Sequence, residues 1–163
     1  MNYKEYISLF KKQLDTLPYQ KQFDLALTIC KKLYFDYKKF VEVHQWGDAD
    51  LLMDAIKLCE HRKAGLVDRL EIEKMLPRID AITPHMDDYG DEISSYGLNA
   101  SAAVYETLQF LIDKDKTHIY NIGNYWTDTI DFRIQEERSL SDDEIAKHPM
   151  MLEAWNYILA LSR

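Results

Sequence analysis

The sequence has 163 residues, of which 47% are hydrophobic, and its formal net charge is −8 at pH 7. A chain of this length can form one domain with its own core, and the apolar content argues against disorder. The acidic balance disfavours nucleic acids and anionic membranes as partners, because like charges repel. We expect a cytoplasmic protein, since residues 1–6 lack the apolar stretch of a signal peptide and no run reaches the roughly 20 apolar residues of a membrane span.

The first part of the chain shows three helical patterns. Residues 2–16 carry an apolar face and end before Pro18, which disfavours continuation of a helix. Residues 19–43 carry apolar side chains at steps of three and four, which predicts a long central helix. Asp48 is a candidate N-cap for a third helix, which Gly65 would close. The apolar stripe of the second helix consists of Phe23, Leu27, Cys30, Tyr34, Tyr37 and Val41.

A fourth helix and a break follow in the middle of the chain. The helix begins near Asp68, with Glu71 three residues later as in a capping box, and it then meets Pro77. Residues 81–92 interrupt the helical pattern and contain three aspartates. We expect an ordered loop here, not a linker between domains, because each half of the chain alone is too small for a good core.

The second half predicts three more helices. Residues 94–113 begin with small side chains, which allow a neighbouring helix to approach closely, and residues 117–138 form the sixth helix. Ser141 and Glu144 have the spacing of a capping box and open a seventh helix that continues to about Leu161. Pro149 lies inside this last segment, so either the helix proper starts at Pro149 or it kinks there.

Taken together, these patterns predict an all-α fold. Only five glycines and four prolines are present, too few for the many turns of an all-β protein. We expect a single-domain bundle of about seven helices over residues 1–163, with an acidic loop near the middle of the chain.

Three blocks of residues occur in the order found in a known family. They are Phe23–Tyr34 followed by Gly47-Asp48, then Asp87–Gly90 followed by Gly97–Ala100, then Thr127–Glu136 followed by Ser141–Glu144 and Trp155. In this order the chain resembles the YjaG-like bacterial family, the domain of unknown function 416. No single block is specific, but their order covers nearly the whole chain. The resemblance implies a helical fold, and it implies no activity and no catalytic residues.

The sixth helix carries the candidate partner-binding surface. Polar side chains without interleaved lysines recur there at steps of three and four, on the side nearly opposite the apolar stripe. This spacing indicates either a solvated face or a contact surface for a partner. A purely solvated face more often carries Glu–Lys pairs, which favours the contact surface. The residues are Asn121, Asn124, Asp128, Asp131 and Gln135.

Arg133 departs from this pattern because its helical angle places it with the apolar side chains. A charge in that position needs a partner, and Asp87, Asp88 or Glu106 could supply a carboxylate. We expect a structural ion pair that fixes the central loop rather than a catalytic arginine.

The acidic loop offers a second candidate. Its residues Asp87, Asp88, Asp91 and Glu92 could ligate Ca²⁺ or Mg²⁺ through oxygen, although their spacing is not that of an EF-hand. The alternative is that they cap the following helix and favour its positive N-terminal end.

Catalytic motifs are missing from the sequence. The five histidines stand singly, and the chain contains neither the Glu-x-x-His pairs of a di-metal bundle nor a Gly-x-Ser-x-Gly elbow nor a phosphate-binding glycine loop. We therefore expect no metal, no cofactor and no catalytic residue, which argues against an enzyme without excluding one.

Two functional hypotheses remain. The first is a non-enzymatic protein–protein interaction module whose partner is basic, such as an immunity-type inhibitor of a basic toxin. The second is an enzyme or small-molecule binder with a polar pocket between the central loop and the sixth helix. Association into a homodimer stays open, since no heptad seam demands it. The residues of that pocket or structural network would be Asp87, Asp88, Asn99 and Arg133, with Asp128 nearby.

Overall fold

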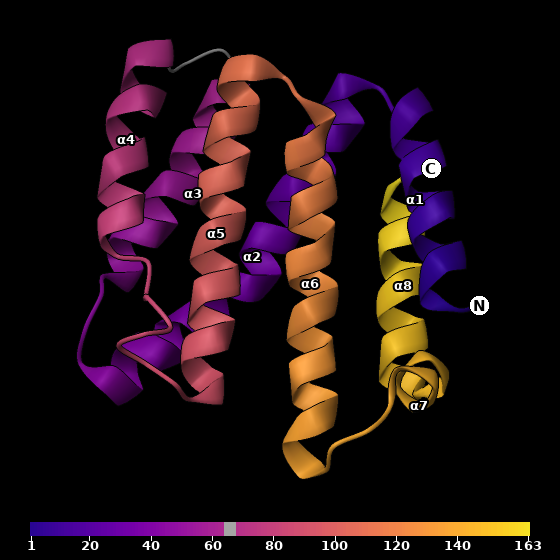
Figure 1. Ribbon diagram of the computed structural model, residues 1–163. Helices are drawn as coiled ribbons and strands as arrows, with labels where there is room; N and C mark the ends of the chain where they lie inside the picture. Colours follow the sequence, from indigo (N-terminus) through magenta and orange to yellow (C-terminus); the bar gives the residue numbers. More distant parts are fainter. Residues whose placement is uncertain (64–67) are drawn as a thin grey trace.

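The computed structural model describes residues 1–63 and 68–163, and all the regular secondary structure in these ranges is helical. Eight helices lie in the described part of the chain and pack side by side as in Figure 1. They are α1 (Tyr3–Thr16), α2 (Tyr19–His44), α3 (Ala49–Lys63), α4 (Arg69–Ala81), α5 (Glu92–Asp113), α6 (Lys116–Glu137), α7 (Asp142–Lys147) and α8 (Pro149–Leu161).

The expected helices are confirmed, with two differences in their ends. The segment expected as one seventh helix is two, because Pro149 occupies the first turn of α8 and lacks the N–H that would continue α7. Helix α4 passes through Pro77 to Ala81, where Ile79 is fully buried in the core. Gly65, expected to close α3, lies outside the described residues.

The expected N-caps form at the predicted residues. The Leu51 N–H donates to Asp48 Oδ1 over 2.9 Å, and the Glu71 N–H donates to Asp68 Oδ1 over 3.1 Å. Ser141 and Glu144 make the reciprocal hydrogen bonds of a capping box. These bonds satisfy amide groups that have no partner inside the helix, and so they fix where each helix begins.

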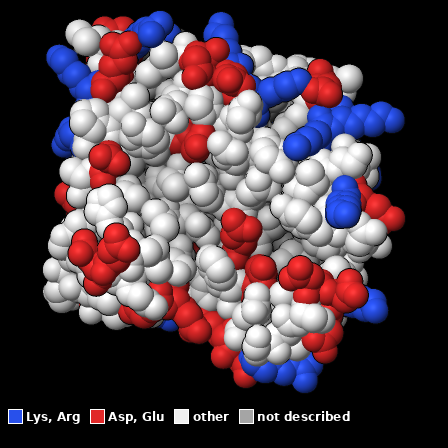
Figure 2. Space-filling view, in the orientation of Figure 1, with Lys and Arg blue, Asp and Glu red and all other residues white. Residues whose placement is uncertain are grey.

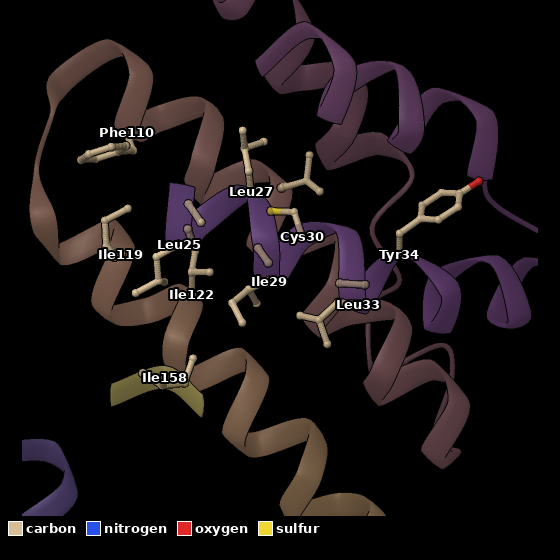
Figure 3. Packing of buried hydrophobic residues seen from close by; sticks show 14 of the residues in the cluster. Leu25, Leu27, Ile29, Cys30, Leu33, Tyr34, Phe110, Ile119, Ile122 and Ile158 are labelled. Atoms are coloured by element: carbon tan, nitrogen blue, oxygen red, sulfur yellow. The ribbon is translucent and has the colours of Figure 1, made fainter. Parts of the chain in front are cut away.

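Helix α2 is the centre of the fold, and it crosses behind α5 and α6 in Figure 1. It buries side chains on two sides, which Figure 3 shows packed against α5, α6 and α8. One hydrophobic cluster joins all the packed helices, so the acidic loop does not separate two cores. The buried side chains of α2 are Phe23, Leu25, Ala26, Leu27, Ile29, Cys30, Leu33, Tyr34, Tyr37 and Phe40.

Two glycines set how closely the helices approach α5 and α6. A Cβ atom on Gly97 would lie 2.8 Å from Cγ of Phe40, and one on Gly123 would lie 2.6 Å from Cε1 of Phe10. The expected close approach at the start of the fifth helix is therefore confirmed at Gly97. Gly123 likewise allows Phe10 of α1 to approach α6 closely.

Helix α6 lies between the two parts of the bundle. It packs on α2 and α5 on one side and on α1 and α8 on the other. No helix among residues 1–63 and 68–163 is both long and apolar enough to span a membrane.

Candidate functional site

The polar stripe of α6 is divided among three grooves. Asp128 and Asp131 line the first, Asn121 lines the second, and Gln135 lines the third. Asp128 is exposed, whereas the other stripe residues are half-buried. The stripe is therefore not the continuous open face that its helical angles predict, because neighbouring helices rise along both of its edges.

The first of these, called here the α6–α7 groove, has a volume of about 250 Å³. It lies between α6, α7, α8 and the start of α1. Three aspartates line it, together with aromatic and apolar side chains and without a lysine or arginine. Its lining residues are Tyr3, Thr127, Asp128, Asp131, Asp142, Ile145, Ala146, Met151 and Trp155.

The short helix α7 closes the lower end of this groove. Its capping box fixes its first turn, and Ile145 anchors it by inserting into the core. Asp142 lies in that first turn, where the helix dipole stabilises a negative charge. Acidic side chains gather over α7 and the lower end of α6 in Figure 2, so the groove opens onto a negative surface.

An aromatic stack forms the wall of the groove on the α8 side. Trp155 is 2% exposed, and its ring lies parallel to that of Tyr6 with the centroids 5.3 Å apart. Neither the Trp155 Nε1 hydrogen nor the Tyr6 hydroxyl has a hydrogen-bond partner among the described residues, and the same holds for Oδ1 of Asn124 on α6. Buried polar groups without partners are few in folded proteins, and these three atoms are themselves shielded from solvent.

The aspartates of the groove influence one another. Although Asp128 is exposed, the surrounding protein atoms and the charge of Asp131 raise the pKa of its carboxyl group above the ordinary value. Asp131 accepts a hydrogen bond of 2.7 Å from Nε2 of Gln135. The site therefore holds negative charge that a cation would stabilise.

The second groove lies along α1 and the start of α6, where Asn121 is engaged within the protein. Nδ2 of Asn121 donates to Glu106 over 3.1 Å, and Glu106 also pairs with His118. Two lysines and one aspartate line this groove: Lys116 pairs with Asp15, while Lys11 lies over the ring of Tyr120. It thus lacks the net negative charge of the α6–α7 groove.

The structure corrects the expected partner of Arg133. Its guanidinium pairs with Asp36 of α2 and lies 5.1 Å from the centroid of the Tyr96 ring. Asp87 and Asp88 were expected as alternatives, but they lie exposed on the central loop, and Glu106 pairs with His118. The inward direction of Arg133 was predicted correctly, yet the ion pair joins α6 to α2 and does not fix the loop.

The four residues expected to form a polar pocket between the central loop and the sixth helix do not lie together in the structure. Asn99 is buried and donates from Nδ2 to Oγ1 of Thr129 over 3.1 Å, and Arg133 faces α2. Asp87 and Asp88 lie in solvent on the loop. The third groove lies between the end of the central loop, the start of α5 and α6, and it is lined by Gly90, Asp91, Glu92, Ser95, Phe132 and Gln135.

The acidic loop is held by aromatic packing and by capping. Tyr89 contacts the rings of Phe40, His44 and Trp46, and the loop carbonyl of Ile82 accepts a hydrogen bond of 2.6 Å from Tyr37. Asp91 accepts from the Ser94 N–H over 3.0 Å and is the N-cap of α5, as expected. Within residues 1–63 and 68–163, no group of His, Cys, Asp and Glu has the arrangement of a metal site.

Apart from Asp128 and Asp131, the residues that line the α6–α7 groove were not predicted as site residues from the sequence. Tyr3, Asp142 and Trp155 come from three different helices, and no local pattern links them. The capping box at Ser141 located the start of α7, but how that helix folds back along α6 depends on the turn before it.

The family model for the "Protein of unknown function (DUF416)" matches residues 9–162. The chain belongs to the DUF416 family. This confirms the resemblance seen in the three sequence blocks. A crystal structure of a DUF416 family protein from Shewanella baltica OS155 is similar to the chain, with a TM-score of 0.77 and 23% identity over 93% of this chain and 82% of that one. This likeness supports the DUF416 fold. No curated protein matches the sequence.

Proposed function

We propose that this DUF416 protein is a protein–protein interaction module that binds a basic segment of its partner in the α6–α7 groove. The observation that carries the proposal is the set of three aspartates, Asp128, Asp131 and Asp142, in a groove that no lysine or arginine lines. Opposite charge at such a surface speeds association and selects the partner.

The size of the groove favours a side chain over a free metabolite. Its volume of about 250 Å³ is below the roughly 300–1,000 Å³ typical of small-molecule pockets. One lysine or arginine side chain fits a space of this kind, with its aliphatic part against Met151 and Ile145 and its charged end beside the aspartates.

The partner of an interaction module presents its cation on a chain segment. The indole N–H of Trp155 has no acceptor among the described residues, but it is shielded from solvent and is not itself a contact for that segment. An inhibitor that covers a basic toxin would be one protein of this class, and its acidic groove would take a lysine or arginine of the toxin surface.

The test measures binding of charged peptides at low salt by isothermal titration calorimetry. The probe is a ten-residue peptide of alternating Lys and Ser, and the control probe alternates Glu and Ser. The groove variant is D128N/D131N/D142N, and its matched control, E42Q/D54N/D80N, removes the same amount of charge from other helices. We expect the basic peptide to bind the native protein and the matched control with similar Kd, and at least tenfold more weakly to the groove variant.

Equal weakening in the two variants would show that net charge alone attracts the peptide, and the proposal would then fall. Because the substituted aspartates lie at the surface or half-buried, circular dichroism should confirm that both variants keep the helical fold.

A further inference from the structure

The outer side of α2 carries an exposed aromatic residue surrounded by lysines. Phe35 is 70% exposed, and lysines occupy the four positions three and four residues before and after it. Residues at these spacings are neighbours on a helix surface. A single exposed Phe is ordinary, but four positive charges around one are not expected on a protein with a net charge of −8. The lysines are Lys31, Lys32, Lys38 and Lys39.

Internal contacts hold two of these lysines away from the Phe35 ring. Lys31 pairs with Glu60 of α3, while Nζ of Lys32 lies 4.8 Å from the ring centroid of Tyr157 on α8. Long lysine side chains often cover apolar surface next to them. Here their partners lie on different helices to either side, so the Phe35 ring stays open to solvent.

Another groove, distinct from the three described above, continues this patch beyond Lys32. It has a volume of about 240 Å³ and lies between α2, α6 and α8. Trp126, Ile130, Met150 and Tyr157 supply its apolar lining, and Nε1 of Trp126 is buried without a hydrogen-bond partner among the described residues. The lysines, Phe35 and this groove thus form one surface, called here the α2 patch.

We propose that the α2 patch binds an acidic segment of a protein that also carries an apolar side chain. The carboxylates of the segment would meet Lys38 and Lys39, which lie in solvent. Its apolar side chain would pack on Phe35 or enter the groove beyond Lys32. This site is separate from the α6–α7 groove, and it takes a ligand of the opposite charge.

The surroundings of the α2 patch favour a protein segment over a membrane. Glu42 follows Lys38 by one helical turn, Glu60 is paired with Lys31, and Glu153 lines the adjoining groove. A flat anionic bilayer would meet these carboxylates together with the lysines, and it would be repelled. A narrow segment can contact the lysines alone.

The experiment titrates the full chain with the fluorescein-labelled peptide Gly-Glu-Glu-Phe-Glu-Glu-Gly and follows fluorescence anisotropy at low salt. The variants are F35A and K38E/K39E, and the matched control is K4E/K12E, which makes the same charge change on α1. We expect saturable binding to the native protein and to the control, a Kd at least tenfold higher for K38E/K39E, and a weaker loss for F35A.

The fold of the variants is not at risk, because all the substituted side chains are exposed. Absence of saturable binding, or the same loss in K4E/K12E as in K38E/K39E, would overturn the proposal. A parallel arm uses phosphatidylserine vesicles. Sedimentation with vesicles that depends on Phe35, without binding of the peptide, would also overturn it in favour of a membrane contact. None of these results depends on whether the α6–α7 groove binds a basic segment.

Discussion

The rings of Tyr6 and Trp155 lie parallel, 5.3 Å apart between centroids, and both polar atoms of this pair lack a hydrogen-bond partner among the described residues. The pair joins α1 to α8 beneath the groove that faces α6. Aromatic rings stacked in this way stabilise the fold beyond the area that they bury, so the pair strengthens the wall of the groove.

The Tyr6 hydroxyl should contribute nothing to stability. Replacing Tyr6 by Phe keeps the stack and removes an unpaired polar atom, so we expect a free energy of unfolding within about 0.5 kcal/mol of wild type, or higher. Tyr37 is the matched control, because its buried hydroxyl donates to the carbonyl of Ile82 and accepts from the Asp48 N–H. Tyr37→Phe should lose about 1–3 kcal/mol in urea unfolding. A Tyr6→Phe loss as large as that of Tyr37→Phe would mean that the Tyr6 hydroxyl is bonded.

The Arg133–Asp36 ion pair should stabilise the crossing of α2 and α6. The side chains are 34% and 16% exposed, and burial raises the pKa of Asp36 while Arg133 lowers it. Arg133→Met leaves a half-buried carboxylate unpaired, and we expect a loss of about 1–3 kcal/mol at pH 7.

This loss should depend on pH in a defined direction. Without Arg133, the folded-state pKa of Asp36 rises further above its unfolded value, so the folded protein takes up a proton more readily. The stability difference between wild type and Arg133→Met should therefore shrink as the pH falls toward 4, and the double variant D36N/R133M should lose less than R133M at pH 7. A difference that stays constant from pH 7 to pH 4 would contradict the account.

His118 should make stability decrease with rising pH. Partial burial lowers its pKa, but the hydrogen bonds to Asp113 and Glu106 outweigh this, and the pKa is raised above the ordinary value. A group whose folded pKa is raised contributes its stability below the unfolded pKa and loses it as the pH rises through the folded pKa. The free energy of unfolding of wild type minus that of His118→Gln should be larger at pH 5.5 than at pH 8.5. A flat difference over this range would show that His118 does not bind its proton more tightly when folded.

Gly97 should be intolerant of a side chain. Its Cβ would lie 2.8 Å from Cγ and 3.0 Å from Cβ of Phe40, which is fully buried and cannot move away. We expect Gly97→Ala to lose about 1–3 kcal/mol despite the better helix propensity of Ala. Gly90→Ala provides the control, since no atom lies within 4 Å of its Cβ. Thermal unfolding of the two variants measures the difference, and equal midpoints would contradict the close packing of α5 on α2.

The sequence predicted those features that depend on neighbouring residues. The capping box at Ser141 and Glu144 and the N-cap at Asp48 depend on hydrogen bonds across three residues, and they form as expected. The inward direction of Arg133 follows from its helical angle alone. Its partner could not be predicted, because Asp36 is 97 residues away and meets it only where α2 crosses α6.

Only part of the α6–α7 groove could be predicted, because the rest depends on contacts between helices that are distant in the sequence. Asp128 and Asp131 share one face of α6, which their spacing shows. Tyr3, Asp142 and Trp155 reach that face from three other helices, and their meeting depends on how α7 turns back and how α1 packs on α8. The helical angles also placed Asn121 on the open face, yet Glu106 of α5 engages it.

The most direct test of the account follows the three tryptophan indole N–H signals by two-dimensional ¹⁵N–¹H NMR while the Lys-Ser peptide is added. Trp155→Phe and Trp126→Phe assign the signals. We predict that the Trp155 signal moves with peptide concentration, because its ring lines the groove and a bound charge changes its surroundings, while the signals of Trp46 and Trp126 stay in place. The movement should be lost in D128N/D131N/D142N. A Trp155 signal that stays fixed while the peptide binds elsewhere would contradict the proposed role of the α6–α7 groove.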